Sequence, residues 1–311
     1  MTIEELPATS PVAVAPARVR RTPRTAVLRA VRPRQWPKNL LVLAAPVAAG
    51  SLGDRPAPLL DAALAGLAFL FASWAIYLVN DVVDAERDRG HPRKRHRPVA
   101  AGDLSPRGAL TWAALAAAGS IAAALAVQHT WLVASVLAYL VLSLLYCLGL
   151  KHVPVLEIVI VASGFLLRGL GGAAALQIPP TLPFTLVYTL CALVVVVAKR
   201  ANERMSMEVS AAAHHRPSLV GYDMQALRWS SRLLMVAAVG SYAVWAITQT
   251  SELLPHLHLL TVVPLAGAFV RFDQRVTRDR HVQVEEIFVR DGTMLMWEAV
   301  WLALFAVSAS S

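Results

Sequence analysis

Long apolar runs recur along the chain, and each is close to the length of a bilayer crossing, for which a helix needs about 20 residues. Only 16% of the residues are charged and 57% are hydrophobic, which excludes an ordinary soluble enzyme, in which about a quarter of residues are charged. Hydropathy windows identify about nine candidate spans: 38–53, 58–79, 107–127, 130–149, 153–176, 182–200, 228–250, 257–271 and 293–309. The sequence therefore predicts an all-α polytopic membrane protein with about nine transmembrane helices.

The basic residues give these spans an orientation. The chain has 29 Lys and Arg against 20 Asp and Glu, and almost all of the cations lie before the first span or in alternate loops. Cytoplasmic loops of membrane proteins carry such an excess of Lys and Arg. We therefore expect a multi-pass protein of the plasma (inner) membrane, with the N-terminus and the basic loops in the cytoplasm and the C-terminus outside.

The first 30 residues differ in composition from the rest. Residues 1–30 are rich in Pro, Ala and Arg and contain no apolar core. Such a composition is typical of a disordered segment, and its cations suit contact with anionic lipid. We expect a disordered basic cytoplasmic tail over 1–30 and one transmembrane domain over 31–311.

An acidic stretch directly follows the second span. Asp81, Asp84 and Asp88 have the spacing i, i+3 and i+7, which places them on one face if the helix continues. Carboxylate oxygens suit Mg²⁺, which proteins commonly hold through one or two carboxylates together with substrate phosphates. The alternative is a solvated helix end, in which these acids pair with Arg87 and Arg89. The position of the acids at the end of a membrane span favours the metal site.

Two basic segments lie on the same side of the membrane as these acids. The loop over 91–98 contains Lys94 and Arg97, and a metal-binding acidic face beside such a loop is what a diphosphate substrate needs. Before the first span, residues 32–39 contain Lys38 among further cations. This second segment alternatively serves only to anchor the first span at the cytoplasmic interface.

Two further charged positions stand out in later spans. Lys199, Arg200 and Glu203 end the sixth span, where a plain helical ion pair between Lys199 and Glu203 is the alternative to substrate binding. Arg168 lies well inside the fifth span. An intramembrane Arg indicates a functional site that faces a polar cavity, whereas the glycines around it are explained more simply by close helix packing.

Together these motifs resemble the UbiA superfamily of intramembrane prenyltransferases, whose first acidic motif corresponds to Asn80-Asp81-x-x-Asp84-x-x-x-Asp88. The longer pattern is similar to one branch, the decaprenyl-phosphate phosphoribosyltransferases, over roughly residues 32–310. The segments that carry this likeness are Arg32-Pro33-x-Gln35-Trp36-x-Lys38-Asn39, Tyr77-Leu78-x-Asn80-Asp81, His91-Pro92-x-Lys94-x-x-Arg97-Pro98, Tyr146-Cys147-x-Gly149-Leu150-Lys151-His152, Ser163-Gly164-Phe165-Leu166-x-Arg168, Lys199-Arg200-x-x-Glu203, Arg216-x-Ser218-Leu219-x-x-Tyr222 and Glu285-Glu286-Ile287.

The resemblance implies a bundle of helices around a membrane cavity that opens to the cytoplasm, with Mg²⁺ and a diphosphate at its mouth. It implies transfer of 5-phosphoribose from phosphoribosyl diphosphate to decaprenyl phosphate or another polyprenyl phosphate, with release of diphosphate, for the arabinan precursor of a cell-wall arabinogalactan. Membrane lipids are then partners, nucleic acid is not, and a homotrimer is compatible with this branch.

The resemblance also implies roles for individual residues. Asp81, Asp84 and Asp88 would hold Mg²⁺, and Asn80 would orient the donor. Three cations would bind the diphosphate: Lys38, Lys94 and Arg97. No general base is needed, because a phosphate acceptor is already anionic.

For the other residues, the question left open is whether they bind the donor's 5-phosphate or the phosphate of the acceptor. Three residues would bind either the donor's 5-phosphate or the acceptor phosphate: Lys199, Arg200 and Tyr222. Arg168 lies deepest in the membrane and is assigned to the lipid phosphate. Three more residues complete the substrate-binding set: Asn39, Tyr77 and Glu203.

Two other function classes remain to be weighed. Prenyl transfer from a polyprenyl diphosphate to an aromatic or other acceptor is the alternative within the superfamily, but that reaction uses a second acidic motif where this chain has Lys199 and Arg200. A transporter for an anionic solute gives no reason for three carboxylates at metal-binding spacing, and the inverted repeats expected of many transporters are not seen.

Overall fold

The computed structural model describes residues 23–49, 56–92, 94–209, 219, 221–248, 257–279 and 283–310. Every regular element within these residues is helical. Within this described part of the chain, six helices are long and apolar enough to cross a membrane: α3 (Pro56–Val83), α5 (Pro106–Ala126), α6 (Thr130–Leu148), α7 (Leu156–Ala175), α8 (Leu182–Val209) and α10 (Met224–Thr248). Six of the expected spans overlap these helices, and the predicted all-α membrane fold is confirmed.

The remaining elements are shorter, except for α14, which has 19 residues like α6. They are α1 (Pro23–Ala30), the 3₁₀ segment η1 (Pro33–Leu43), α2 (Ala44–Ala48), α4 (Ala85–Arg89), η2 (Lys94–His96), η3 (Leu150–His152), α11 (Leu257–Leu260), α12 (Val262–Arg278), α13 (Val284–Arg290) and α14 (Gly292–Ser310). The eighth expected span falls on α11 and α12, and the ninth falls on the apolar helix α14. The expected count of about nine spans is therefore approximate.

The first expected span, over 38–53, is not a single straight helix as far as the structure describes it. Residues 33–43 form η1, and the chain then turns into the five-residue helix α2. Pro37 inside this segment accounts for part of the difference, because it lacks the amide hydrogen that the interior of a regular α-helix needs. The tighter 3₁₀ winding keeps this segment outside the long spanning helices, where it packs against α3 and α7.

The expected boundary of the disordered tail is also too late in the chain. Residues 23–30 form α1, while residues 1–22 lie outside the described part of the chain. Ala26 and Ala30, one helical turn apart, are fully buried against a group of side chains that includes Leu78 of α3. A short apolar stripe thus orders α1 despite its polar composition, because the stripe has a partner surface.

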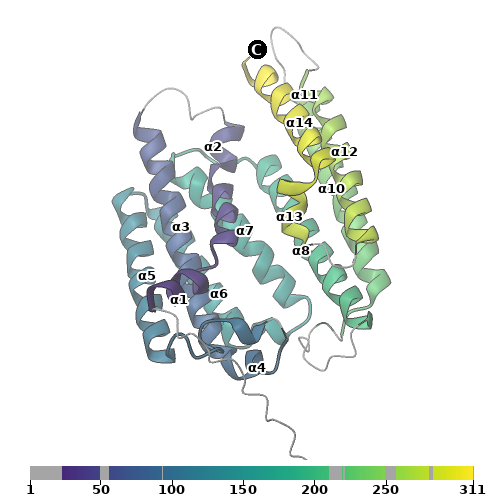
Figure 1. Ribbon diagram of the computed structural model, residues 1–311. Coiled ribbons are helices and arrows are strands. Elements are labelled where there is room, and N and C mark those ends of the chain that lie inside the picture. The colour runs from purple at the N-terminus through teal and green to yellow at the C-terminus, as the bar shows by residue number, and fades with distance from the viewer. Residues whose placement is uncertain are drawn as a thin grey trace, which may run out of the picture.

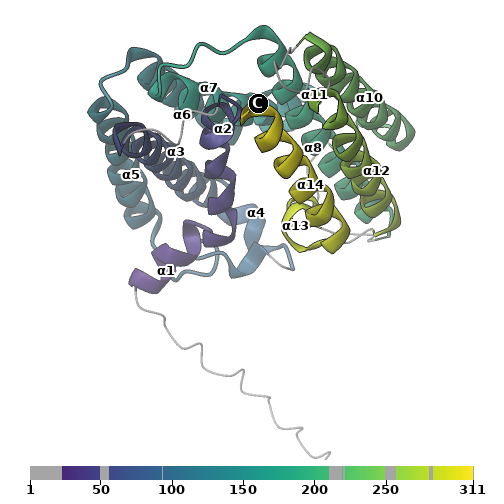
Figure 2. The same cartoon turned by 90° about the horizontal axis from the view of Figure 1, so that it is seen from above.

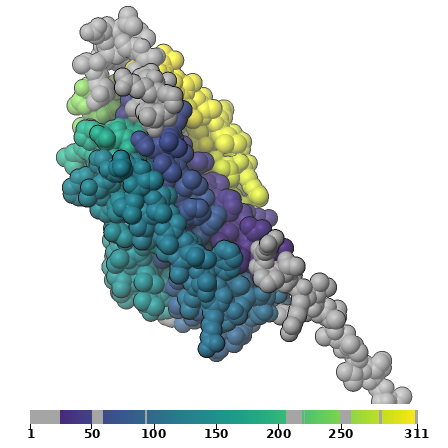
Figure 3. All heavy atoms as spheres, turned by 90° about the vertical axis from the view of Figure 1, so that its left-hand side faces the viewer, coloured from purple at the N-terminus to yellow at the C-terminus, as the bar shows by residue number. Residues whose placement is uncertain are grey.

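The spanning helices fall into two groups, with α7 between them (Figure 1). One group contains α3, α5 and α6, and the other contains α8, α10, α12 and α14; α7 packs against both α6 and α8. Viewed from above, the helices form a ring in which α2 and α14 lie near each other and α13 lies beside α14 (Figure 2). The outer face of the first group is covered by α5 and α6 (Figure 3).

Small residues bring the helices of the first group close together. Ala65, Ala68 and Ala72 of α3 lie on one face and are buried in a core shared with α5, α6 and α7. Gly172 of α7 has a similar role, because a Cβ atom there would collide with the Val42 carbonyl oxygen of η1. Such close approach is typical of membrane helix packing, and here it fixes η1 against the centre of the bundle.

Candidate active site

The segment that begins at Arg32 forms one wall of the candidate site. Arg32 has φ 51° and ψ 70°, in the left-handed region that residues other than glycine rarely adopt. Its guanidinium lies 2.6 Å from Oδ1 of Asp81 and covers the ring of Tyr77, with Cζ 4.9 Å from the ring centroid. Backbone strain of this kind gathers at functional sites, where the surrounding contacts maintain it. The structure therefore holds Arg32 over the acidic motif.

The acidic motif lies where α3 passes into α4. Asp84 separates the two helices, yet its backbone N–H donates to the Asn80 carbonyl (2.9 Å), and that of Asp88 donates to the Asp84 carbonyl (2.8 Å). The helical path thus continues through the motif. Asp81 and Asp88 are buried, so this is not a solvated helix end.

Each carboxylate of the motif has a basic partner from another part of the chain. The pairs are Arg32 with Asp81 (2.6 Å), Arg97 with Asp88 (2.7 Å) and Lys151 with Asp84 (2.5 Å). Arg97 also approaches Asp81 at 3.7 Å. These cations remove the repulsion that three neighbouring carboxylates would otherwise feel.

A polar pocket of about 150 Å³ opens beside these pairs. Its lining includes six residues of the predicted site: Tyr77, Asn80, Asp84, Asp88, Lys94 and Arg97. Arg32 and Lys151, which the sequence did not mark as site residues, line it as well. The structure therefore brings together the acidic motif and the basic loop, as the sequence predicted.

A second cluster of charges lies apart from this pocket. Nζ of Lys38 lies 3.1 Å and Nζ of Lys199 lies 2.5 Å from the same atom, Oε1 of Glu285 on α13. Burial alone would raise the pKa of Glu285, but the two ammonium groups lower it to about 2. Burial and the neighbouring Lys199 lower the pKa of Lys38 to about 8. Lys199 thus contacts Glu285, and the expected helical partner of Lys199, Glu203, accepts a hydrogen bond from Arg200 (2.6 Å).

Arg168 is buried and hydrogen-bonded to neutral groups. It donates from Nε to Asn39 Oδ1 (3.0 Å), from Nη1 to the Gly164 carbonyl (2.6 Å), and from Nη2 to Ser73 Oγ (2.9 Å) and the Tyr139 hydroxyl (3.1 Å). None of these four partners is a carboxylate. The predicted intramembrane Arg therefore joins η1, α3, α6 and α7, and Asn39, another predicted site residue, lies in the same network.

Arg200 and Tyr222 meet in a buried network around Glu157. Nε of Arg200 donates to Oε1 of Glu157 (2.6 Å), and the Tyr222 hydroxyl also donates to that atom (3.3 Å). Burial raises the pKa of the Tyr222 hydroxyl, which keeps its proton for this bond. The same hydroxyl accepts from the backbone N–H of Val155 (2.8 Å), a residue with φ 65°. The structure thus places these two predicted phosphate ligands around a carboxylate of the protein.

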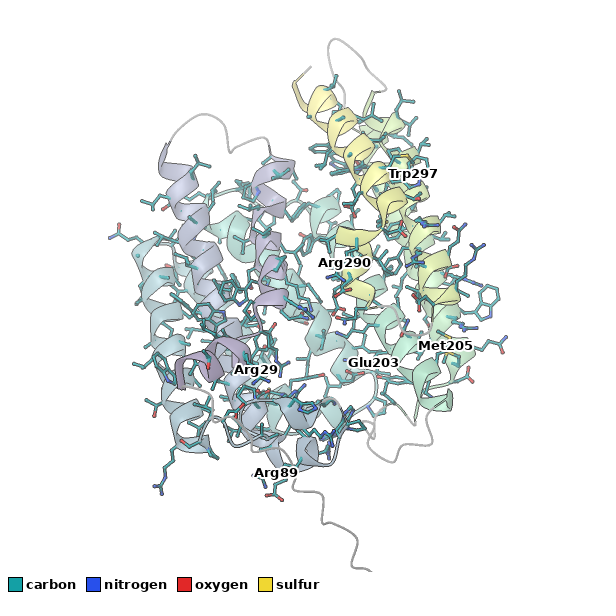
Figure 4. The ribbon with its side chains drawn as sticks, viewed as in Figure 1. Arg29, Arg89, Glu203, Met205, Arg290 and Trp297 are labelled. Atoms are coloured by element: carbon teal, nitrogen blue, oxygen red, sulfur yellow. The ribbon has the colours of Figure 1, made fainter. Side chains whose placement is uncertain are left out.

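A large apolar cavity of about 530 Å³ lies beside the Lys38–Glu285–Lys199 cluster. It is bounded by α2, α8, α10, α12, α13 and α14, and its lining includes the aromatic side chains of Phe184, Tyr188, Trp245, Trp297, Trp301 and Phe305. Figure 4 marks Trp297 on α14 above Arg290 on α13, with Glu203 on α8 below both. Among the described lining residues, only Glu298 is charged.

Some of the residues that were not predicted as site residues nevertheless have a signal in the sequence. Arg32, Lys151 and Glu285 all lie in the quoted motifs, but their motif positions did not reveal which groups they contact. Glu157 had no such signal. It lies in an apolar run at the start of α7, and its partners Arg200 and Tyr222 follow 43 and 65 positions later.

Comparison with known proteins identifies the family. The model of the UbiA prenyltransferase family matches residues 40–307. This chain belongs to the UbiA family. Decaprenyl-phosphate phosphoribosyltransferase of Mycolicibacterium smegmatis is 35% identical to this UbiA-family chain over 291 residues, which cover 89% of the chain and 90% of the relative. The enzyme of the same name from Mycobacterium tuberculosis is 36% identical over 280 residues and 92% of its own length.

A solved structure shares the fold. The UbiA homolog from Archaeoglobus fulgidus bound to DMAPP and Mg²⁺ superposes on this UbiA-family chain with a TM-score of 0.70, at 17% identity, over 92% of this chain and 99% of that one. At this identity the likeness concerns the fold alone. The expected UbiA-like bundle is confirmed.

The acidic motif has features that fit a divalent metal ion. Oδ2 of Asp81 is buried and has no hydrogen-bond partner within the described chain. Among these residues, no three His, Cys, Asp or Glu side chains are grouped as a complete metal site. Mg²⁺ does not need such a group, because it is commonly held by one or two carboxylates together with waters and substrate phosphates. The residues present therefore fit a metal that arrives with a diphosphate.

Proposed function

We propose that this chain transfers the 5-phosphoribosyl group from phosphoribosyl diphosphate to decaprenyl phosphate or another polyprenyl phosphate and releases diphosphate. The single observation that supports this most strongly is 35–36% identity, over about nine-tenths of the chain, to relatives named for that reaction. The geometry of the site supports it independently, because an anionic donor and an anionic lipid need two sets of cations.

The polar pocket suits the donor. Arg32, Lys94 and Arg97 line it together with Asp84 and Asp88. Guanidinium groups bind phosphate oxygens through charge-assisted hydrogen bonds. On donor binding, Arg32 and Arg97 would exchange part of their contact with carboxylates for contact with phosphates, and Asn80 would orient the donor as predicted.

Asp84 and Asp88, which line this pocket, and the buried Asp81 would hold Mg²⁺, as predicted from their spacing. Bound there, the ion supplies Lewis-acid stabilisation of the negative charge on the departing diphosphate. Lys151 positions Asp84, and Arg32 and Arg97 position Asp81 and Asp88. These cations also balance the charge of the motif, because each carboxylate has a positive partner.

The reaction requires little covalent chemistry from the protein. An oxygen of the lipid phosphate attacks C1 of the ribose, the bond from C1 to the diphosphate oxygen breaks, and the diphosphate leaves with the electron pair. The attacking oxygen is already anionic, so no side chain has to remove a proton. The cations of the chain orient the two substrates and neutralise their charge, which is where catalysis of such displacements mainly arises.

The apolar cavity suits the hydrocarbon chain of the acceptor. Its aromatic and aliphatic walls resemble the apolar interior of the bilayer, so a polyprenyl tail can pass from the bilayer into the cavity without being exposed to water. The chain is an integral membrane protein, so a lipid substrate reaches the cavity from the bilayer. The plasma-membrane location, the cytoplasmic N-terminus, the external C-terminus, the homotrimer and the role in cell-wall arabinan synthesis stay predictions.

A comparison of donors tests the proposed function. Purified protein is supplied with Mg²⁺ and either labelled phosphoribosyl diphosphate plus a polyprenyl phosphate, or labelled polyprenyl diphosphate plus an aromatic acceptor. We expect a labelled lipid product in the first mixture only. A prenylated acceptor in the second mixture, without product in the first, would support the alternative of prenyl transfer.

A further inference from the structure

Lys38 and Lys199 come from opposite groups of helices and meet at one atom. Lys38 belongs to η1 and Lys199 to α8, and both ammonium groups contact Oε1 of Glu285. Two ammonium groups held around one anionic oxygen form a ready phosphate site once that oxygen moves away. The Lys199 side chain is 37% exposed and Glu285 is 23% exposed, so an external anion can reach the cluster.

Two elements of this cluster, α8 and α13, line the apolar cavity, and so does α2, which follows η1 directly. Val195 lies one turn before Lys199 on α8, Phe288 lies one turn after Glu285 on α13, and Ala44 follows η1 directly. All three line the cavity. A lipid whose chain occupies the cavity would therefore present its headgroup to the two lysines.

The donor pocket lies on a different wall. Its lining comes from α3, α4, the basic loop, the end of α6, η3 and Arg32, and it shares no residue with the lining of the apolar cavity. One segment joins the two sites, because Arg32 and Lys38 lie six positions apart. At about 2 Å per residue in a 3₁₀ segment, their Cα atoms are about 12 Å apart. The long side chains of Arg32 and Lys38 can hold the donor and the acceptor in contact across that distance.

We propose that Lys38 and Lys199 bind the phosphate of the lipid acceptor, and that Glu285 is a built-in counter-ion which this phosphate displaces. This inference rests on the proposed function and resolves the alternative that the sequence left open for Lys199. It replaces two roles that the resemblance implied, the diphosphate for Lys38 and the lipid phosphate for Arg168. The contact with Glu285 spares the two lysines the cost of lying unpaired and partly buried. When the phosphate enters, its oxygens take the place of Oε1.

The charge change in the reaction gives Glu285 a second effect. A phosphate monoester has a second pKa near 6 and is largely doubly charged at neutral pH. Once the ribose is attached, the same group is a phosphodiester with a single negative charge. Glu285 competes better against one charge than against two, so it returns to the lysines and displaces the product headgroup.

A matched pair of variants on α13 tests this proposal. E285Q removes the counter-ion, while E286Q makes the same change one position later, where the carboxylate pairs with Arg290 (2.9 Å). Binding of farnesyl phosphate, inorganic phosphate and phosphoribosyl diphosphate to the full chain is measured by calorimetry in detergent. We expect E285Q to bind farnesyl phosphate about ten-fold more tightly, with donor affinity unchanged. Inorganic phosphate should gain less, because it lacks the chain that occupies the cavity, and E286Q should resemble the wild type throughout.

The other outcomes overturn parts of the proposal. Tighter binding of phosphoribosyl diphosphate to E285Q, with farnesyl phosphate unchanged, would place the donor's 5-phosphate at the lysines. Unchanged or weaker binding of all three ligands would remove the counter-ion role. The double variant K199Q/E285Q should not show the tighter binding of farnesyl phosphate expected for E285Q, because the lysine that the phosphate needs is absent. A different result would show that the proposed function itself is wrong: wild-type protein that binds farnesyl phosphate but forms no phosphoribosyl lipid.

Discussion

Nζ of Lys151 lies 2.5 Å from Oδ1 of Asp84, in the middle of the acidic motif. The Lys151 side chain is 4% exposed, and η3 brings it there from 67 positions along the chain. A buried lysine at this point ties the end of α6 to the junction of α3 and α4. The acidic motif is thus part of a charge-balanced structure that joins three helices.

Lys151→Met should destabilise the folded protein, because it leaves Asp84 largely buried without its cation. Breaking a buried pair in this way costs about 3 kcal/mol. Thermal unfolding in detergent measures the effect. The double variant K151M/D84N should recover part of the loss, since no uncompensated charge remains. Strictly additive losses in the two single variants and their combination would contradict a direct interaction.

Asp81→Asn should reduce turnover by about 100-fold or more even at saturating Mg²⁺, because it removes a carboxylate from the proposed metal site. Asp103→Asn is the control, since Asp103 is an acid in the next loop that pairs with Arg29 (3.1 Å) outside the pocket. The assay is transfer of labelled phosphoribose to polyprenyl phosphate. Near-normal turnover of D81N, or an equal loss in D103N, would refute the metal assignment.

Arg168→Lys tests whether this residue acts through packing or through the lipid phosphate. A lysine cannot supply donors in the fixed directions that reach Asn39, Ser73, Tyr139 and the Gly164 carbonyl. We expect a lower unfolding temperature, with a loss of about 2–4 kcal/mol as buried acceptors lose their partners. A stable R168K protein with only a raised KM for the lipid acceptor would instead support the predicted phosphate contact.

The lowered pKa of Lys38 predicts that binding of the lipid phosphate depends on pH. Its pKa is lowered from 10.5 to about 8, so the ammonium is charged below that pH and becomes neutral above it. Lys199 and Arg168 act in the same direction as burial, while Glu285 opposes them. Affinity for farnesyl phosphate should therefore fall as the pH rises through about 8. Lys38→Arg should remove most of this fall, because arginine keeps its charge; an unchanged profile in K38R would exclude Lys38 as its source.

Local patterns in the sequence were sufficient for the spans and for the acidic motif. Both depend on short-range spacing, and the hydrogen bonds from Asp84 to Asn80 and from Asp88 to Asp84 follow the helical path that this spacing implies. The segment 33–43 was harder to predict, because its apolar residues suit a span while the interior Pro37 disfavours a regular α-helix. There, backbone chemistry outweighed hydropathy.

The partners of the charged residues could not be predicted in the same way. Lys38 and Glu285 are 247 positions apart, and neither has a local feature that indicates the other. Arg200 shows the same limit. Its position at the end of a span suggested a phosphate ligand, whereas the fold brings the buried carboxylate of Glu157 to it. Such pairs depend on how the two groups of helices close around α7.

The most direct test of the proposed function is the product of a single reaction. Purified wild-type protein is incubated with phosphoribosyl diphosphate, a polyprenyl phosphate and Mg²⁺. The lipid fraction is analysed by mass spectrometry, and the amount of released diphosphate is measured in the same reaction. We predict one diphosphate for each polyprenyl phosphate that gains a phosphoribosyl group. Unchanged polyprenyl phosphate, with either no diphosphate released or free ribose 5-phosphate formed, would contradict the transfer.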